Sequence, residues 1–239
     1  VNEYPDLQGL MGKYFALSQG FEEDVSNAVS DHYLPLGNNS MTSKKPISYV
    51  VAISDKIDTL VGFFLINEKP TSSKDPFALR RSAIGLLRTI IDNKLNLKLR
   101  NLISFNIKLL EEQGVIKTNE NSENEILNFL KERMKNILKD KNIKNDIIEA
   151  SISSYFSDNY FDLYKKNTLM NKYINKEAGI NAISSYKRAF NIVESAKENL
   201  SGRPDAVLFR KDEEKHLFEK LNEIRKSFTV NEQDKDYEK

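Results

Sequence analysis

Apolar residues recur at spacings of three and four along almost the whole chain, and this pattern limits the fold more than any other feature. Residues 47–64 place Ile47, Val50, Ile57, Leu60 and Phe64 on one face, and residues 126–138 repeat the pattern. Such spacing is typical of amphipathic helices. Only nine Gly and six Pro occur in 239 residues, too few for an all-β fold with a turn about every ten residues. The sequence therefore predicts an all-α protein.

Polar stretches, Gly and Pro set the expected limits of the helices. The expected ranges are 6–18, 22–34, 47–64, 75–94, a further helix to 110, then 126–138, 143–154, 158–173, 178–200 and 210–228. Asp75 followed by Pro76 predicts a helix start, because a carboxylate caps free backbone N–H groups and proline suits the first turn. Residues 118–124 are polar and lack periodicity. They predict a boundary between two helical bundles, 1–118 and 119–239.

Composition and charge argue against several classes of protein. The formal net charge is +1 and is balanced on both sides of residue 118, so binding to nucleic acid by bulk electrostatics is not expected. Cys is absent, which excludes disulfides and thiolate metal sites. No apolar run approaches the roughly 20 residues that cross a bilayer, and no leader opens the chain. We therefore expect a cytoplasmic protein without a membrane segment. Since the chain begins without Met and ends in a charged stretch, we also expect it to be a piece of a longer protein.

Two carboxylates three residues apart, Asp55 and Asp58, form the first candidate site. On a helix they share one face, where they could bind a divalent metal or share a proton, although ion pairs with a neighbouring helix are the commoner arrangement. Residues 50–58, with the sequence Val-Val-Ala-Ile-Ser-Asp-Lys-Ile-Asp, are similar to the last metal-binding motif of HD-superfamily phosphohydrolases. The His-Asp pair of that family is missing from the chain. Because one acid cannot hold a metal alone, we expect a degenerate HD helix with no metal and no catalytic residue.

The chain has two histidines that could act as ligands, His32 and His216. His32 stands at the end of an expected helix, where a partly positive side chain is favoured by the terminal carbonyls, so we expect a capping or packing role. His216 lies in a run of Lys and Glu and is expected to be solvated.

Arg80 falls within the apolar face of the helix expected after Asp75. A buried guanidinium must be paired. We therefore expect a structural ion pair from Arg80 to Asp55 or Asp58.

Two sets of basic residues are candidates for contact with nucleic acid. Lys74, Arg81 and Arg88 recur every seven residues, and three cations in line can follow a phosphate backbone; a solvated helix edge is the alternative. The second set, in the predicted C-terminal bundle, comprises Lys131, Arg133, Lys135, Lys139, Lys187 and Arg188. Aromatic residues that could stack on bases lie nearby at Tyr155, Phe156, Tyr160, Phe161 and Tyr164. At least half of these aromatics are expected in the core, and Arg133 and Arg188 could instead brace helices.

The most specific motif is Lys74-Asp75-Pro76-Phe77-Ala78-Leu79-Arg80-Arg81, which resembles a hallmark of the β subunit of heterotetrameric bacterial glycyl-tRNA synthetase. The resemblance continues in order along almost the whole chain, through residues 4–12, 33–35, 85–91, 129–133, 146–150, 187–192, 208–209 and 213–217. It implies a degenerate HD-like domain followed by a helical anticodon-binding domain of the DALR type that is cut short at its C-terminal end.

The same resemblance implies a function. The chain would bind glycine tRNA, while the α subunit of an α2β2 enzyme would use ATP and Mg²⁺ to attach glycine. Its partners would be glycine tRNA, the α subunit and a second β subunit, and it would hold no cofactor of its own. Two alternatives stay open: a metal-dependent HD phosphohydrolase whose other ligands lie upstream, and a purely structural scaffold that docks the α subunit.

Overall fold

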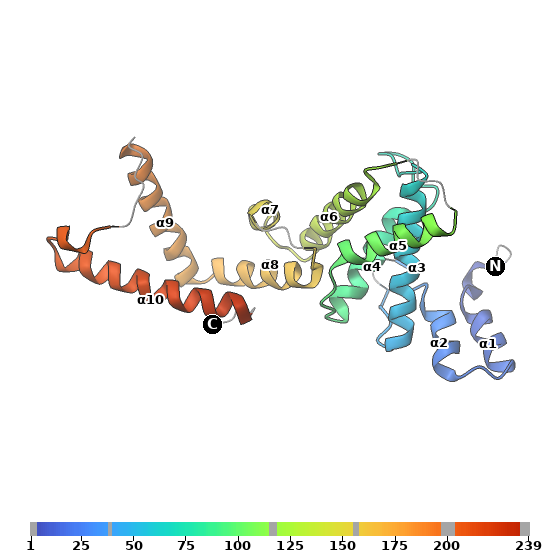
Figure 1. The fold of residues 1–239 in the computed structure, drawn as a ribbon. Coiled ribbons are helices and arrows are strands. Elements are labelled where there is room, and N and C mark those ends of the chain that lie inside the picture. Colours follow the sequence, from blue (N-terminus) through green and yellow to red (C-terminus); the bar gives the residue numbers. More distant parts are fainter. Residues whose placement is uncertain (1–3, 38–39, 115–118, 155–157, 197–203, 235–239) are drawn as a thin grey trace. The chain divides into compact units, whose positions relative to one another are not determined.

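The protein is helical wherever its structure is described. The computed structural model describes residues 4–37, 40–114, 119–154, 158–196 and 204–234, and all regular structure in these ranges is helical (Figure 1). The elements are η1 (Pro5–Leu7), α1 (Leu10–Ser18), α2 (Glu23–Asp31), α3 (Pro46–Leu65), α4 (Leu79–Asp92), α5 (Leu99–Glu112), α6 (Ser122–Asp140), α7 (Asn145–Ser154), α8 (Tyr160–Ile174), α9 (Glu177–Ala196), η2 (Ala206–Leu208) and α10 (Asp212–Asp234). The predicted all-α class is confirmed.

The chain divides into two compact units, Val1–Asn167 and Thr168–Lys239. In the first unit α3 is the central helix, because it packs against α2, α4, α5 and α6. Its apolar face is fully buried at Leu60, Val61 and Leu65, and Leu86 and Ile90 of α4 are equally buried. Burial of this many large aliphatic side chains, at about 1.5–3 kcal/mol each, is the main force that holds such a unit together.

The boundary predicted at residue 118 lies inside the first unit. α6 follows that boundary, yet it packs against α3, α4 and α5, and its residues Ile126, Leu130 and Met134 have no exposed surface. The ring of Phe129 in α6 lies 5.4 Å from that of Phe64 in α3. The apolar face of α6 thus completes the core of the preceding helices, and the compact unit extends to Asn167.

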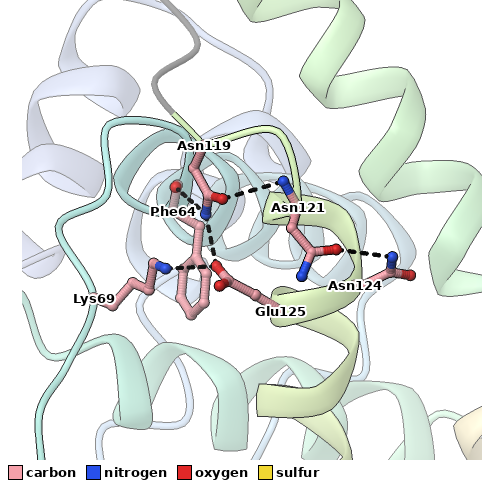
Figure 2. Close-up of polar contacts among 6 residues, drawn as sticks. All are labelled: Phe64, Lys69, Asn119, Asn121, Asn124 and Glu125. Carbon is pink, nitrogen blue, oxygen red and sulfur yellow. Dashed lines mark hydrogen bonds and ion pairs between the residues drawn. The ribbon is translucent and has the colours of Figure 1, made fainter.

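The polar residues that precede α6 form a hydrogen-bonded connection to the end of α3 (Figure 2). The side-chain amide of Asn119 donates to the carbonyl oxygen of Phe64 at 3.3 Å and to the carboxylate of Glu125 at 2.6 Å. Its own amide oxygen accepts from the backbone N–H of Asn121 at 3.1 Å. Lys69 pairs with Glu125 at 2.7 Å. The lack of periodicity in this segment therefore marks a helix start that is tied to the core.

α1 packs closely on α2. A methyl group added at Gly12 would come within 2.8 Å of Val29 Cγ1, so the absence of a side chain there allows the two helices to approach. Tyr14 and Phe15 of α1 are more than half exposed.

The second unit contains α9 and α10. The ring of Phe209 packs edge-on against that of Phe218 in α10, with centroids 5.3 Å apart. The helix predicted over 178–200 is described to Ala196, and residues 197–203 lie outside the described ranges. Among the described residues, no helix has both the length and the apolar character needed to cross a bilayer.

Candidate nucleic-acid interface

The start of α4 differs from the prediction. The helix begins at Leu79, three residues after Pro76. The two carboxylate oxygens of Asp75 accept hydrogen bonds from the backbone N–H groups of Leu79 and Arg80, at 2.9 and 3.0 Å, and Ala78 adopts a left-handed conformation with φ 53°. Asp75 therefore caps the helix as expected, but from four residues before its first turn. As a consequence, Lys74 lies in the loop and not on the helix with Arg81 and Arg88.

A groove follows one side of α4 and consists of two adjoining cavities that share Ile84 and Arg88. The larger cavity has a volume of about 400 Å³, and the smaller about 180 Å³. The larger is lined by Ile84, Arg88, Ile91 and Asp92 of α4, by Asn136, Ile137, Asp140 and Lys141 at the end of α6, and by Tyr164 of α8. The smaller is lined by Pro35, Gly37, Arg81, Ile84, Gly85 and Arg88. We name these two cavities together the α4 groove. It brings together two of the basic residues that the sequence singled out.

The two arginines of the groove are held differently. The guanidinium of Arg88 donates to the carbonyl oxygens of Gly37 at 2.9 Å and of Ser40 at 2.6 Å, so Arg88 fixes the segment between α2 and α3 against α4. Arg81 is exposed, and within the described part of the chain its side chain makes no hydrogen bond or ion pair. Arg81 is therefore available to a ligand, whereas Arg88 also has a structural role.

Arg80 does not form the expected ion pair. Its guanidinium donates to the carbonyl oxygen of Thr71, and among the described residues it pairs with neither Asp55 nor Asp58. The reason is the late start of α4, which places Arg80 in the first turn beside the loop that contains Thr71. Asp55 and Asp58 are exposed on α3, and Asp58 accepts a hydrogen bond from the side-chain amide of Asn106 at 3.3 Å.

Lys56, which directly follows Asp55, is buried, with 6% of its surface exposed. Its ammonium group donates to the carbonyl oxygen of His32 at 2.7 Å. Burial lowers the pKa of Lys56, and the nearby charge of Asp55 opposes this shift. A methyl group added at Gly85 of α4 would come within 2.9 Å of Lys56 Cε and 3.4 Å of Pro35 Cδ. The lysine thus fills space that the missing side chain of Gly85 leaves between α3 and α4.

The histidines lie apart from any cluster of metal ligands. His32 follows the last residue of α2, and its ring Nδ1 lies 3.1 Å from the carbonyl oxygen of Ala28, as expected for a residue that caps a helix end. His216 is exposed on α10. Within the described residues, no three His, Cys, Asp or Glu side chains converge in a way that could hold a metal ion.

The basic residues predicted on α6 are mostly engaged within the protein. The guanidinium of Arg133 lies 4.5 Å from the centre of the Phe129 ring, and burial, followed by the positive charge of Arg80, lowers the pKa of Arg133. Lys135 forms ion pairs with Glu149 at 3.0 Å and Glu132 at 3.3 Å, and its hydrogen bond to Glu149 raises the pKa of Lys135. Lys131 is half-buried and Lys139 is exposed. The structure therefore favours a bracing role for Arg133 and Lys135.

The remaining candidates lie elsewhere. Lys187 and Arg188 are exposed on α9 in the second unit. Tyr160 is fully buried, and its hydroxyl donates to the carbonyl oxygen of Leu127 at 3.3 Å. Tyr164 is partly exposed and lines the α4 groove. Tyr155 and Phe156 lie outside the described residues.

Sequence reasoning missed two features of this region. Lys56 stands three residues after Ile53 and four before Leu60, on the buried face of α3, and a lysine at such a position is a readable signal of a buried amine. Asn136 and Asp140, four residues apart on α6, line the larger cavity. No pattern in the sequence marks them, because the cavity exists only where α4, α6 and α8 meet.

Comparisons with known proteins bear on the whole chain. A family model described as "Glycyl-tRNA synthetase beta subunit" matches residues 1–153. The glycine–tRNA ligase beta subunit of Rickettsia canadensis is 39% identical over 239 residues, which cover 100% of this chain and 34% of the relative. The corresponding subunit of a Ruegeria species is 39% identical over 199 residues, which cover 83% of this chain and 27% of the relative. The subunit of Paracoccus denitrificans is 37% identical over 226 residues, which cover 93% of this chain and 31% of the relative.

The chain spans about a third of the length of the curated relatives that it matches. The family model covers α1 to α6 and most of α7, and therefore every lining residue of the α4 groove except Tyr164 of α8. Because that family model accounts for well over half of its residues, the chain belongs to the glycyl-tRNA synthetase beta subunit family.

Proposed function

We propose that this chain is a tRNA-binding part of the β subunit of a glycine–tRNA ligase and supports the ATP-dependent attachment of glycine to its tRNA. In this proposal the enzyme is a cytoplasmic α2β2 tetramer. The aminoacylation site, with ATP and Mg²⁺, lies on the α subunit, and no residue of this chain is catalytic. α1–α5 would be a degenerate HD-like domain, and the helices after residue 118 would belong to an anticodon-binding region.

The observation that supports this proposal most directly is the position of Arg81 in the α4 groove. Arg81 and Arg88 both line the smaller cavity, and among the described residues that line it none is acidic. A local concentration of positive charge on a protein with a net charge of +1 can hold phosphate groups without strong non-specific affinity for RNA. Lys74, in the loop before α4, is exposed and would extend this contact. Lys187 and Arg188, which are exposed on α9, would contact RNA separately.

A titration against three RNAs tests the proposal. The protein is titrated with glycine tRNA, the same tRNA with a changed anticodon and an unrelated tRNA, at two salt concentrations. We expect glycine tRNA to bind most tightly. Arg81→Ala should weaken all three complexes and reduce the slope of log K against log salt by about one, as expected for one lost phosphate contact.

Lys108→Ala is the matched control, because Lys108 is an exposed cation on α5, away from the groove. It should leave the affinities unchanged. Equal binding of the three tRNAs, together with equal effects of the two substitutions, would overturn the proposal.

A second candidate function is supported by the surface of α1. Tyr14 and Phe15 are exposed to 54% and 59%, and adjacent exposed aromatic residues are common at protein interfaces. The chain would then act as a scaffold for the α subunit. Replacement of both residues by Ser should in that case impair assembly with the α subunit, measured by size-exclusion chromatography, while the affinity for RNA stays the same.

A further inference from the structure

The two cavities of the α4 groove differ in charge. Arg88 and Lys141 in the larger cavity are balanced by Asp92 and Asp140. The smaller cavity has Arg81 and Arg88 and, among its described lining residues, no acid. A phosphate is therefore favoured in the smaller cavity, whereas the larger one suits an uncharged polar group.

The walls of the larger cavity suit a flat heterocycle. Three of its lining residues are isoleucines, and Tyr164 is partly exposed there. Its volume of about 400 Å³ lies within the range of small-ligand pockets, and its lining combines these apolar side chains with polar and charged ones. Single-stranded nucleic acids are bound in this way, with bases stacked on aromatic side chains and hydrogen-bonded at their edges.

Polar groups for such hydrogen bonds are available at one end of α6. Asn136 can both donate and accept, and Asp140 can accept. Both residues are exposed, and within the described part of the chain neither side chain has a hydrogen-bond or ion-pair partner. Asp92, in contrast, already accepts a hydrogen bond from the hydroxyl of Thr42 at 2.9 Å. Asn136 and Asp140 are thus the groups that could read a base edge.

We infer that the α4 groove binds one unpaired nucleotide of an RNA, with its base in the larger cavity beside Tyr164 and its phosphate in the smaller cavity at Arg81. This inference rests on the proposed function, since it names the part of the RNA that the groove recognises. Tyr164 stacks on the base, Asn136 and Asp140 select it, and Arg81 holds the phosphate whatever the base.

The test uses the full-length protein, fluorescent single-stranded RNA hexamers of each base and a duplex of the same length, with dissociation constants measured by fluorescence anisotropy at one salt concentration. Tyr164→Leu should weaken single-strand binding at least about fivefold, the lower end of the effect of losing one base–aromatic stack. Tyr164→Phe should restore it to within about twofold, because the ring is kept.

Asn136→Ala should change the order of preference among the four hexamers. Asn128→Ala is its control, because Asn128 is an exposed residue of the same helix outside the α4 groove. Arg81→Ala should weaken single-stranded and duplex RNA alike. Circular dichroism melting shows whether each variant is folded, and photocrosslinking of a 4-thiouridine hexamer to the unaltered protein gives a second readout, with adducts expected at 136–141 or 164.

The outcomes separate the two proposals. If the unaltered protein binds no RNA, the proposed function fails. If it binds RNA, but Tyr164→Leu has no effect and adducts map elsewhere, only the nucleotide pocket is refuted. If mononucleotides compete as well as the hexamers do, the pocket takes a free nucleotide and the assignment to RNA is overturned.

Discussion

Replacement of Arg88 by Ala tests how the α4 groove is held together. Among the described residues, the guanidinium of Arg88 donates hydrogen bonds to the carbonyl oxygens of Gly37 and Ser40. These bonds attach the segment between α2 and α3 to α4, and Gly37 itself lines the smaller cavity. The substitution therefore removes a structural contact and a cation of the groove at the same time.

The expected loss of stability is worked from the bonds that Arg88 makes to these two described carbonyls. A hydrogen bond with one charged partner contributes about 1.5–3 kcal/mol when buried. The bond to Gly37 is exposed and that to Ser40 is partly buried, so both carbonyls can be rehydrated, and about 1 kcal/mol for each bond is the better figure. We expect Arg88→Ala to lower the free energy of unfolding by about 2 kcal/mol. For a chain of this length that corresponds to a fall in melting temperature of about 4–8 °C.

Urea unfolding followed by circular dichroism measures this change. Arg81→Ala is the matched control, because it removes an arginine from the same helix. Among the described residues the Arg81 side chain makes no hydrogen bond or ion pair, so its loss should change the free energy of unfolding by less than about 0.5 kcal/mol. Arg88→Lys should recover about half of the loss, because an ammonium group lacks the fork that reaches two carbonyls at once. Equal stability of Arg88→Ala and Arg81→Ala would refute the reasoning.

Three further predictions concern the core of the first unit. Gly12→Ala should destabilise the protein by about 1 kcal/mol or more, because the new methyl group would lie 2.8 Å from Val29 Cγ1; an unchanged urea midpoint would show that α1 can shift without cost. Asn119→Ala should cost about 1–2 kcal/mol, since Asn119 joins α6 to the end of α3, whereas Asn124→Ala, which removes one exposed bond, should cost less; equal losses would contradict this. Burial places the pKa of Lys56 below 10.5 in the folded state, so between that pKa and 10.5 the unfolded chain binds more protons. The unfolding free energy of the unaltered protein, minus that of Lys56→Met, should therefore rise as the pH rises from about 7 to about 10. If this difference fell over the same range, the pKa of Lys56 would not be lowered in the folded state.

The sequence was sufficient for the fold class because the apolar spacing of each helix is a local property. The prediction of 47–64 for α3 is within one residue of Pro46–Leu65 at each end, whereas α6, predicted over 126–138, spans Ser122–Asp140. The buried positions of both helices recur regularly, and the described structure places them in the core. The start of α4 could not be predicted, because the bonds from Asp75 to Leu79 and Arg80 require a turn at Ala78 in a left-handed conformation. Nothing in an Asp-Pro pair distinguishes that turn from an ordinary first helical turn.

The candidate site could be predicted only in part. Arg81 and Arg88 were found from a spacing of seven residues, which survives because both lie on α4. The expected pair of Arg80 with Asp55 or Asp58 depended on which sides of α3 and α4 meet, and helix periodicity does not specify this. The function assigned to the HD-like and anticodon-binding regions stays a prediction, because it depends on contacts with RNA and with the α subunit.

The geometry of the α4 groove depends on Gly85, although this residue has no side chain that could bind a ligand. Lys56 and Pro35 pack so closely on α4 that a Cβ atom at position 85 would lie 2.9 Å from Lys56 Cε and 3.4 Å from Pro35 Cδ. Gly85 lies between Arg81 and Arg88 along the helix. A larger residue at position 85 would push the helix outward and displace both arginines together, although every charged group of the groove would still be present. Replacement of Lys56 by a residue with a shorter side chain should make room for the larger residue at position 85. Positions 56 and 85 are therefore expected to be substituted in concert, and the RNA affinity that we propose for the groove would depend on steric fit on the side of α4 that faces α3.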